Sequence, residues 1–178
     1  QTEDSNKYQK IFKRDVVKII TPGTILDDSL LESKSYNYLL CIASLKGEIS
    51  ISWTDMSTGK INLQKISNNS IEELFEMITR IEPEEIIISD VQEKILKLDS
   101  KFSQFLNKFS NIHQDFFDPK SNKEKVNKFF GTSFFSKQES VEDSDISAIG
   151  ALINYLELTQ KQNIPLIKEF EIVKKEEF

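Results

Sequence analysis

Three short apolar segments separated by turn residues place the strongest constraint on the fold of this chain. Residues 38–45 form a nearly continuous apolar run, and residues 48–54 and 60–66 alternate apolar and polar side chains, as strands do. The residues between the segments, Lys46-Gly47 and Ser57-Thr58-Gly59, are typical of hairpin turns. The pattern predicts an antiparallel meander of three strands.

A helix and a further strand are predicted directly after this meander. Ser70, followed three residues later by Glu73, has the pattern of a capping box at a helix N-terminus. Apolar residues then recur at helical spacing, and Pro83 marks the end of the helix. Residues 86–88 are three consecutive isoleucines, which is typical of a short strand buried on both faces. Such a unit predicts a strand that joins the sheet in parallel.

The second half of the chain is predicted to be mainly helical. Asp90 is placed to cap a helix whose apolar side chains continue to Phe109, either as one long helix or as two that break near Asp99-Ser100. The sequence then predicts a fifth strand, a charged helix or loop and a last helix, over residues 112–117, 120–130 and 144–160. The order β-β-β-α-β-α-β-α predicts an α/β, ribonuclease H-like fold. Such a fold has a mixed sheet, three antiparallel strands extended by parallel strands, with flanking helices.

Composition excludes several classes of function. With 38% hydrophobic and 29% charged residues, the chain can build a core. Its net charge of -6 argues against strong autonomous DNA binding, which usually needs a basic patch. One cysteine and one histidine exclude an intrachain disulfide and a Cys/His zinc site, and they favour a cytoplasmic location. No apolar run approaches the ~20 residues of a membrane helix, and no glycine-rich phosphate loop is present.

Two turns and a helix end are predicted from residues with special backbone preferences. Thr21-Pro22-Gly23-Thr24 fits a type II turn, because proline fixes φ at the second position and glycine accepts the positive φ of the third. Asp55 is suited to open a hairpin turn that Gly59 closes. Gly131 is expected to end the helix or loop of residues 120–130.

Three carboxylates allow an alternative, catalytic interpretation. Nucleases of this fold bind one or two Mg²⁺ ions with carboxylates, and Asp55, Asp90 and Asp145 are candidate ligands. Each also has a structural interpretation. Asp55 can open a turn, Asp90 can be an N-cap, and Asp145 can lie at a helix N-terminus, where the dipole favours negative charge. Asp55 moreover follows the second strand, whereas the nuclease carboxylate belongs to the first. The structural interpretation is favoured, and no catalytic, metal-binding or cofactor-binding residue is assigned.

An aromatic cluster surrounds Gly131-Thr132. Its members either fold back into the core or form an exposed patch for a partner, and they are Phe129, Phe130, Phe134 and Phe135. The lysines of residues 120–125 either touch DNA or lie on a solvated helix face, and the second interpretation is favoured.

Three single residues are given structural interpretations. His113 has no neighbouring nucleophile or orienting partner in the sequence, so a surface position is expected. Cys41 lies inside an apolar strand and is expected to be a small core residue. Trp53 alternates with Ile49 and Ile51, which favours core packing over a ligand platform.

Several stretches of the chain are similar, in order and spacing, to the MutS family of DNA mismatch-repair proteins. These stretches are residues 14–24, residues 53–59, Phe130-Gly131-Thr132, and residues 147–160 followed by Ile164-Pro165. The resemblance implies that this chain is a piece of a longer protein. It also implies that the chain itself has four parts. Residues 1–15 would end the mismatch-recognition domain, and residues 16–34 would be a linker that contains the Thr-Pro-Gly-Thr turn. Residues 35–165 would be the connector domain, and residues 166–178 would lead toward the lever domain.

The resemblance also implies a function. In this family the connector domain has a ribonuclease H-like fold without nuclease activity. It relays conformational change between the mismatch-recognition domain and the ATPase and clamp domains, and it offers a docking surface to MutL. The family's mismatch-inserted Phe-x-Glu and its Walker A loop are not in this sequence. ATP, Mg²⁺, mismatched DNA and a homodimeric state are therefore implied only for the longer protein, and the chain itself is expected to be no enzyme and to need no cofactor. The alternatives are a metal-dependent nuclease and a generic α/β interaction domain.

Overall fold

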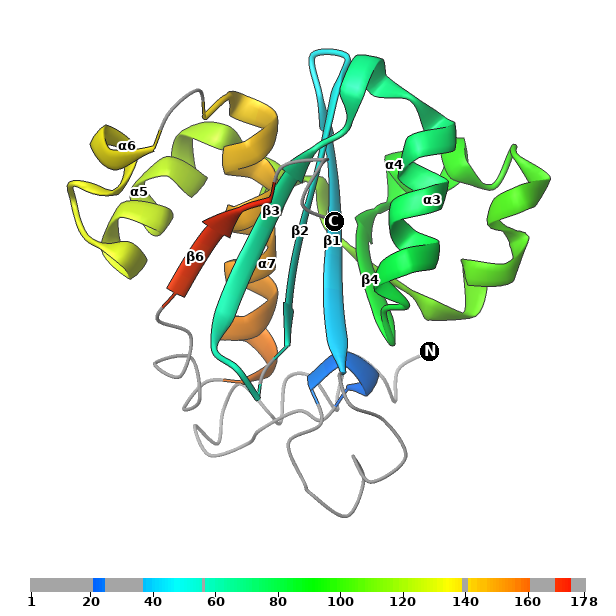
Figure 1. Ribbon diagram of the computed structural model, residues 1–178, viewed down its shortest axis with the longest axis horizontal. Coiled ribbons are helices and arrows are strands. Elements are labelled where there is room, and N and C mark those ends of the chain that lie inside the picture. Colours follow the sequence, from blue (N-terminus) through cyan, green and yellow to red (C-terminus); the bar gives the residue numbers. More distant parts are fainter. Residues whose placement is uncertain (1–20, 25–36, 56, 139–140, 161–168, 174–178) are drawn as a thin grey trace.

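A mixed sheet forms the centre of the protein, with helices on both faces (Figure 1). This computed structural model describes residues 21–24, 37–55, 57–138, 141–160 and 169–173. In that part of the chain the sheet has six strands, in the order β5-β4-β1-β2-β3-β6. Only β2 runs antiparallel to its neighbours, and every other neighbouring pair is parallel. The predicted sheet of three antiparallel strands extended by parallel ones is therefore confirmed.

The antiparallel meander forms as the sequence predicts. Its strands are β1, β2 and β3, with bounds Tyr38–Leu45, Glu48–Asp55 and Lys60–Lys65. At the first hairpin Leu45 pairs with Glu48, and the two residues between them both have positive φ, 53° at Lys46 and 76° at Gly47. Positive φ at both central positions is the requirement of a two-residue hairpin whose twist matches that of the strands.

The predicted helix and strand after the meander are also present. A short 3₁₀ helix, η2, precedes α3 and β4, and the bounds of the three are Ser67–Asn69, Ile71–Ile81 and Glu85–Ser89. Ser70 caps α3, since its Oγ accepts a hydrogen bond from the Glu73 N–H at 3.2 Å. The capping box is incomplete, because the Glu73 carboxylate accepts from Ser67 N–H instead. The helix ends at the left-handed residue Glu82, directly before Pro83, and β4 is buried throughout.

The segment after β4 differs most from the prediction. It consists of α4, the 3₁₀ helix η3, β5 and the 3₁₀ helix η4, with bounds Asp90–Leu96, Ser100–Lys108, Phe109–Ile112 and Gln114–Phe117. The helical region is not one long helix. It breaks near Asp99-Ser100, which was the second of the two predicted alternatives. The strand over residues 112–117 was predicted too late, because residues 109–112 pair with β4. His113 then accepts a hydrogen bond on Nδ1 from the Asp115 N–H and starts η4.

Helix α4 does not bury the apolar face that its spacing predicts. Val91, Ile95 and Leu98 follow at steps of four and three residues, yet they are 54%, 51% and 88% exposed. The buried residues of α4 are Gln92 and Leu96. Helix α4 and the turn that follows it therefore present exposed apolar side chains at Val91, Ile95 and Leu98.

The last part of the described chain supplies helices for the other face of the sheet and one edge strand. It contains α5, α6, α7 and β6, with bounds Pro119–Phe130, Phe134–Lys137, Asp143–Thr159 and Glu169–Ile172. Residues 120–130, predicted as a helix or a loop, are helical, and Gly131 follows with a φ of 101°. Strand β6, in a segment for which the sequence indicated only an extended or helical run, pairs in parallel with β3.

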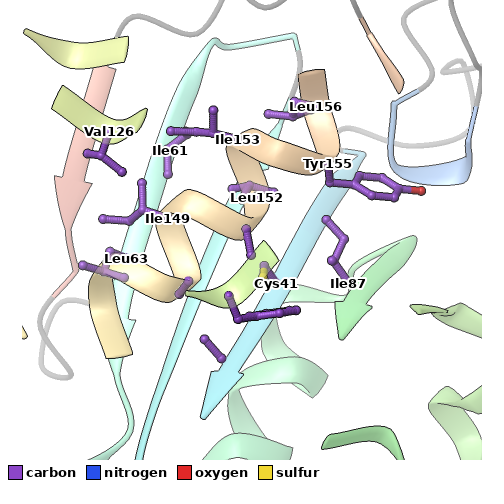
Figure 2. Packing of buried hydrophobic residues seen from close by; sticks show 14 of the residues in the cluster. Cys41, Ile61, Leu63, Ile87, Val126, Ile149, Leu152, Ile153, Tyr155 and Leu156 are labelled. Atoms are coloured by element: carbon purple, nitrogen blue, oxygen red, sulfur yellow. The ribbon is translucent and has the colours of Figure 1, made fainter. Parts of the chain in front are cut away.

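Two separate hydrophobic clusters lie on the two faces of the sheet. One packs α3, α4 and η3 against the sheet and includes Trp53. The other packs α7 and α5 against it (Figure 2) and includes Cys41. The predicted apolar face of α7 is confirmed, because all five of its residues are buried, namely Ile146, Ile149, Leu152, Ile153 and Leu156. No helix within the described ranges has the length and apolar character needed to cross a membrane.

Candidate functional site

The Pro-Gly turn, residues Thr21–Thr24, is seated against the start of the sheet (Figure 1). It is a turn of 3₁₀ helix, η1 (Pro22–Thr24), and the φ of Gly23 is not positive, so the predicted type II turn is wrong. Glycine is needed here for another reason. A Cβ on Gly23 would lie 2.8 Å from Leu39 Cδ1 and 3.0 Å from Glu85 Cβ. The backbone of the turn therefore lies directly on β1 and β4, where a side chain has no room.

A buried carboxylate bonds this turn to the rest of the domain. Glu85 is the first residue of β4 and is only 2% exposed. Its Oε1 accepts a hydrogen bond from the Gly23 N–H at 3.1 Å, and its Oε2 accepts from Ser110 Oγ at 2.6 Å and from the Tyr155 hydroxyl. Burial of a carboxylate is costly unless it is hydrogen-bonded, and these three donors compensate for that cost. They come from η1, β5 and α7, so one side chain joins three separate elements.

Tyr155 shows the electrostatic consequence of this arrangement. Its side chain extends from α7 past Ile87 toward the end of the sheet at which β1 begins (Figure 2). Burial, followed by the negative charge of Glu85, raises the pKa of the Tyr155 hydroxyl well above its ordinary value. Side-chain hydrogen bonds with Ser110 and Thr21 act in the opposite direction. Tyr155 thus contacts both the carboxylate and the turn that the carboxylate holds.

Asp55 lies where the sequence places it, in the turn after β2. It is 3% exposed, and its Oδ1 accepts hydrogen bonds from the N–H and Oγ of Ser57 at 2.9 and 2.8 Å. Its carbonyl accepts from the N–H groups of Thr58 and Gly59, and Gly59 has a φ of 69°. These bonds are those of a hairpin turn opened by aspartate and closed by glycine.

Asp145 and Asp90 start helices, but only one of them makes the bonds of a cap. Asp145 is 4% exposed, accepts from Ser50 Oγ at 2.6 Å, and completes a capping box with Glu142. Asp90 is exposed and is the first residue of α4. The predicted N-cap at Asp90 is wrong, because Ser89 accepts the hydrogen bond from the Gln92 N–H.

The structure does not bring the three candidate metal ligands together. Asp55 is paired with Tyr38 at one end of β1, whereas Asp90 follows β4 at the other end. Asp145 bonds to Ser50, five residues before Asp55 on β2, which corresponds to roughly 17 Å along the strand. Asp145 and Asp90 also begin helices that pack on opposite faces of the sheet. Among the described residues, no three acidic, histidine or cysteine side chains are grouped closely enough to hold a metal ion.

The four phenylalanines around Gly131 pack mainly inward. Phe134 is 5% exposed, and the other three are half-buried against the hydrophobic cluster on the α7 face. The rings of Phe130 and Phe134 are stacked at 5.0 Å, and both contact Phe170 of β6. The cluster therefore closes the core between α5, α6 and β6, and the half-buried rings contribute an apolar border to the surface.

A surface groove runs beside this border, between α5 and α7. It has a volume of about 420 Å³ and is lined by Ser121, Glu124, Lys125, Lys128, Phe129 and Glu157. Lys125 and Glu157 form an ion pair across it. The lysines predicted on a solvated helix face do lie on α5, and Lys120 and Lys123 are exposed there.

The three single residues have structural surroundings in this fold. His113 is exposed at the start of η4. Cys41 is fully buried, and burial raises the pKa of its thiol, which disfavours the reactive thiolate. Trp53 is 3% exposed and belongs to the core on the α3 face.

Sequence reasoning missed the group formed by Glu85, Ser110 and Tyr155. One signal was available, because Glu85 directly precedes three isoleucines of a strand predicted to be buried on both faces. A carboxylate at such a position needs donors. The identity of those donors had no local signal.

The fold and this site define a class of protein: a ribonuclease H-like α/β domain whose candidate carboxylates are dispersed. A family model described as MutS domain II matches residues 37–168. DNA mismatch repair protein MutS of Ehrlichia chaffeensis is 35% identical over 94% of this chain and 21% of its own length. MutS of Wolbachia pipientis is 33% identical over 100% of this chain and 21% of its own length. MutS of Alkaliphilus oremlandii is 36% identical over 97% of this chain and 20% of its own length.

The chain therefore belongs to the MutS family. It spans about a fifth of the length of the curated relatives that it matches.

Proposed function

We propose that this chain is the non-catalytic connector module of a MutS-type DNA mismatch-repair protein. Its core is the domain of residues 35–165, and residues 16–34 link it to the mismatch-recognition domain. It relays conformational change between mismatch recognition and the ATPase and clamp domains, and it offers a docking surface to a MutL-type protein. The names of the relatives support the repair process as its setting.

The observation that carries the non-catalytic part of this proposal is the dispersal of Asp55, Asp90 and Asp145. Two-metal hydrolysis needs carboxylates that converge on ions about 4 Å apart. Asp55 and Asp145 instead use carboxylate oxygens to hold a turn and a helix N-terminus. Within the described ranges, the competing nuclease function therefore lacks its ligand set.

The face of α5 is the surface that best fits docking of a partner protein. It combines the groove between α5 and α7 with the half-buried rings of Phe129, Phe130 and Phe135. Aromatic side chains are enriched at protein interfaces, and a polar, solvent-accessible rim commonly surrounds them. The proposed partner is the N-terminal domain of a MutL-type protein.

Other properties belong to the longer protein in this proposal. Its relatives are about five times as long as this chain, so mismatched DNA, ATP with Mg²⁺, and homodimer formation are assigned to parts beyond it. The proposed location is the cytoplasm.

Binding to an immobilised MutL N-terminal domain, measured by biolayer interferometry with and without Mg²⁺ and a DNA duplex, tests this function. We expect saturable binding that Lys128→Glu weakens by about tenfold, equivalent to about 1.4 kcal/mol. The matched control is Lys94→Glu, the same charge reversal at an exposed site on α4, across the sheet.

No binding of the unchanged chain, or equal loss in both variants, would contradict docking through α5. Cleavage of the duplex in the presence of Mg²⁺, abolished by Asp55→Asn, would replace the proposal with the nuclease.

A further inference from the structure

Glu85 occupies a position between the beginning and the end of the described domain. The Pro-Gly turn that it holds lies before β1, where the chain enters the sheet. Tyr155 lies in the last turns of α7, just before the chain leaves that helix at Thr159. The Gly23 N–H and the Tyr155 hydroxyl are 132 residues apart in sequence, yet they donate to the two oxygens of one carboxylate.

The geometry makes these contacts dependent on one another. A planar carboxylate cannot move one oxygen without moving the other, so a shift that keeps the bond to Gly23 changes the bond to Tyr155. The seat of Gly23 against Leu39 and Glu85 leaves no room for a Cβ, so the turn can only lift away from the sheet. Thr21, in the same turn, also acts on the Tyr155 hydroxyl, whose pKa it lowers.

We propose that Glu85 is a latch that couples the position of the Pro-Gly turn to the C-terminal end of α7. In the closed state the turn is seated and the carboxylate binds Gly23, Ser110 and Tyr155 together. In the open state the turn has left its seat, the Gly23 N–H exchanges with water, and Tyr155 bonds to Glu85 without the fixed orientation that the turn provides. The proposal rests on the proposed relay function, because the turn is pulled only if a preceding domain moves.

Hydrogen exchange at a single amide tests the latch directly in the isolated chain. In the closed state the Gly23 N–H donates to Glu85, so its exchange rate by NMR reports how often the latch opens. Tyr155→Phe removes a donor from the other carboxylate oxygen and leaves Gly23 and Glu85 unchanged. We expect Gly23 exchange to become about 2- to 10-fold faster in Tyr155→Phe, the change that corresponds to losing one hydrogen bond.

The matched control is Thr159→Val, which also removes a hydroxyl that hydrogen-bonds at the end of α7. The Thr159 hydroxyl donates to the Tyr155 carbonyl and has no bond to Glu85. We expect Gly23 exchange in this variant to equal that of the unchanged chain, and amides of β1 such as Cys41 to be equally protected in all three proteins. Ser110→Ala, which also removes a donor to Oε2, should reproduce the effect of Tyr155→Phe and provides a second variant if Tyr155→Phe folds poorly.

Two results would overturn the latch. In the first, Gly23 exchanges at the same rate in Tyr155→Phe, Ser110→Ala and the unchanged chain. In the second, Gly23 and Cys41 amides accelerate together, which indicates general destabilisation. Because neither MutL nor DNA is present in this experiment, its failure is separate from failure of MutL docking, and the two proposals can be judged independently.

Discussion

Replacement of Gly150 by alanine should destabilise the protein, although the same change in most helices has the opposite effect. Gly150 lies in α7 where the helix crosses α5. A Cβ at this position would lie 2.2 Å from Cγ and 2.3 Å from Cβ of Asn122. Because one of these atoms is attached directly to the α5 backbone, rotation of the Asn122 side chain cannot relieve the contact. The two helices must move apart.

The expected loss follows from the bonds that Asn122 makes. Asn122 is 1% exposed, donates to the Phe116 carbonyl at 2.9 Å and accepts from Asn154 at 3.1 Å. Overpacking costs about 1–3 kcal/mol, and each lost hydrogen bond about 0.5–1.5 kcal/mol. Alanine regains about 1 kcal/mol through its helix propensity. We therefore expect the free energy of unfolding of Gly150→Ala to fall by about 3 kcal/mol.

Urea unfolding followed by tryptophan fluorescence measures this change, since Trp53 is buried and is the single tryptophan of the chain. Asn122→Gly provides the control, because it removes both the Cγ and the Cβ that obstruct the new methyl group. Its combination with Gly150→Ala should be at least about 1 kcal/mol more stable than the sum of the single changes predicts. An unchanged or increased stability in Gly150→Ala alone would refute the crossing geometry.

Two further predictions concern the carboxylate group and the start of α4. Burial and the charge of Glu85 raise the pKa of Tyr155 above its unfolded value of about 10, so the unfolded chain loses this proton first as pH rises. This contribution to stability is complete below about pH 10 and is lost above it by up to about 1.4 kcal/mol per pH unit. Between pH 10 and 11 the unfolding free energy of Tyr155→Phe should therefore fall less steeply than that of the unchanged chain. Equal slopes in the two proteins would contradict the assignment. Ser89→Ala should lower the unfolding free energy by about 1 kcal/mol through loss of the N-cap, whereas Asp90→Asn should change it by less than about 0.5 kcal/mol. Urea unfolding measures both changes. A larger loss in Asp90→Asn than in Ser89→Ala would restore Asp90 as the cap.

The parts of the fold that could be predicted from the sequence are those specified by neighbouring residues. Lys46-Gly47 fixes its hairpin because both residues adopt positive φ, and the isoleucines of β4 require burial wherever the strand lies. The apolar face of α7 was identified for the same reason, since its period of three and four residues is a local property.

The parts that could not be predicted depend on residues far apart in the chain. The donors to Glu85 lie 62, 25 and 70 residues away, and no spacing rule connects them. Gly23 shows how a correct local signal leads to a wrong conformation, because Pro-Gly predicts a type II turn, whereas contact with Leu39 selects glycine for its lack of a side chain. The exposed stripe on α4 is a third case. Its period is that of a buried face, and only the packing of Leu96 shows which side turns inward.

The lengths of the strands have a consequence for how the isolated chain behaves at high concentration. In the described part of the sheet, the outermost strands are β5 and β6, with four residues each, while the eight-residue strands β1 and β2 lie inside. A four-residue edge points only about four backbone polar groups outward, because successive residues alternate between the two sides of a strand. So few groups give a second molecule a weak template for strand pairing. The long strands, which would be good templates for fibre growth, are reached only after an edge strand has been removed, so fibre formation should require partial unfolding first.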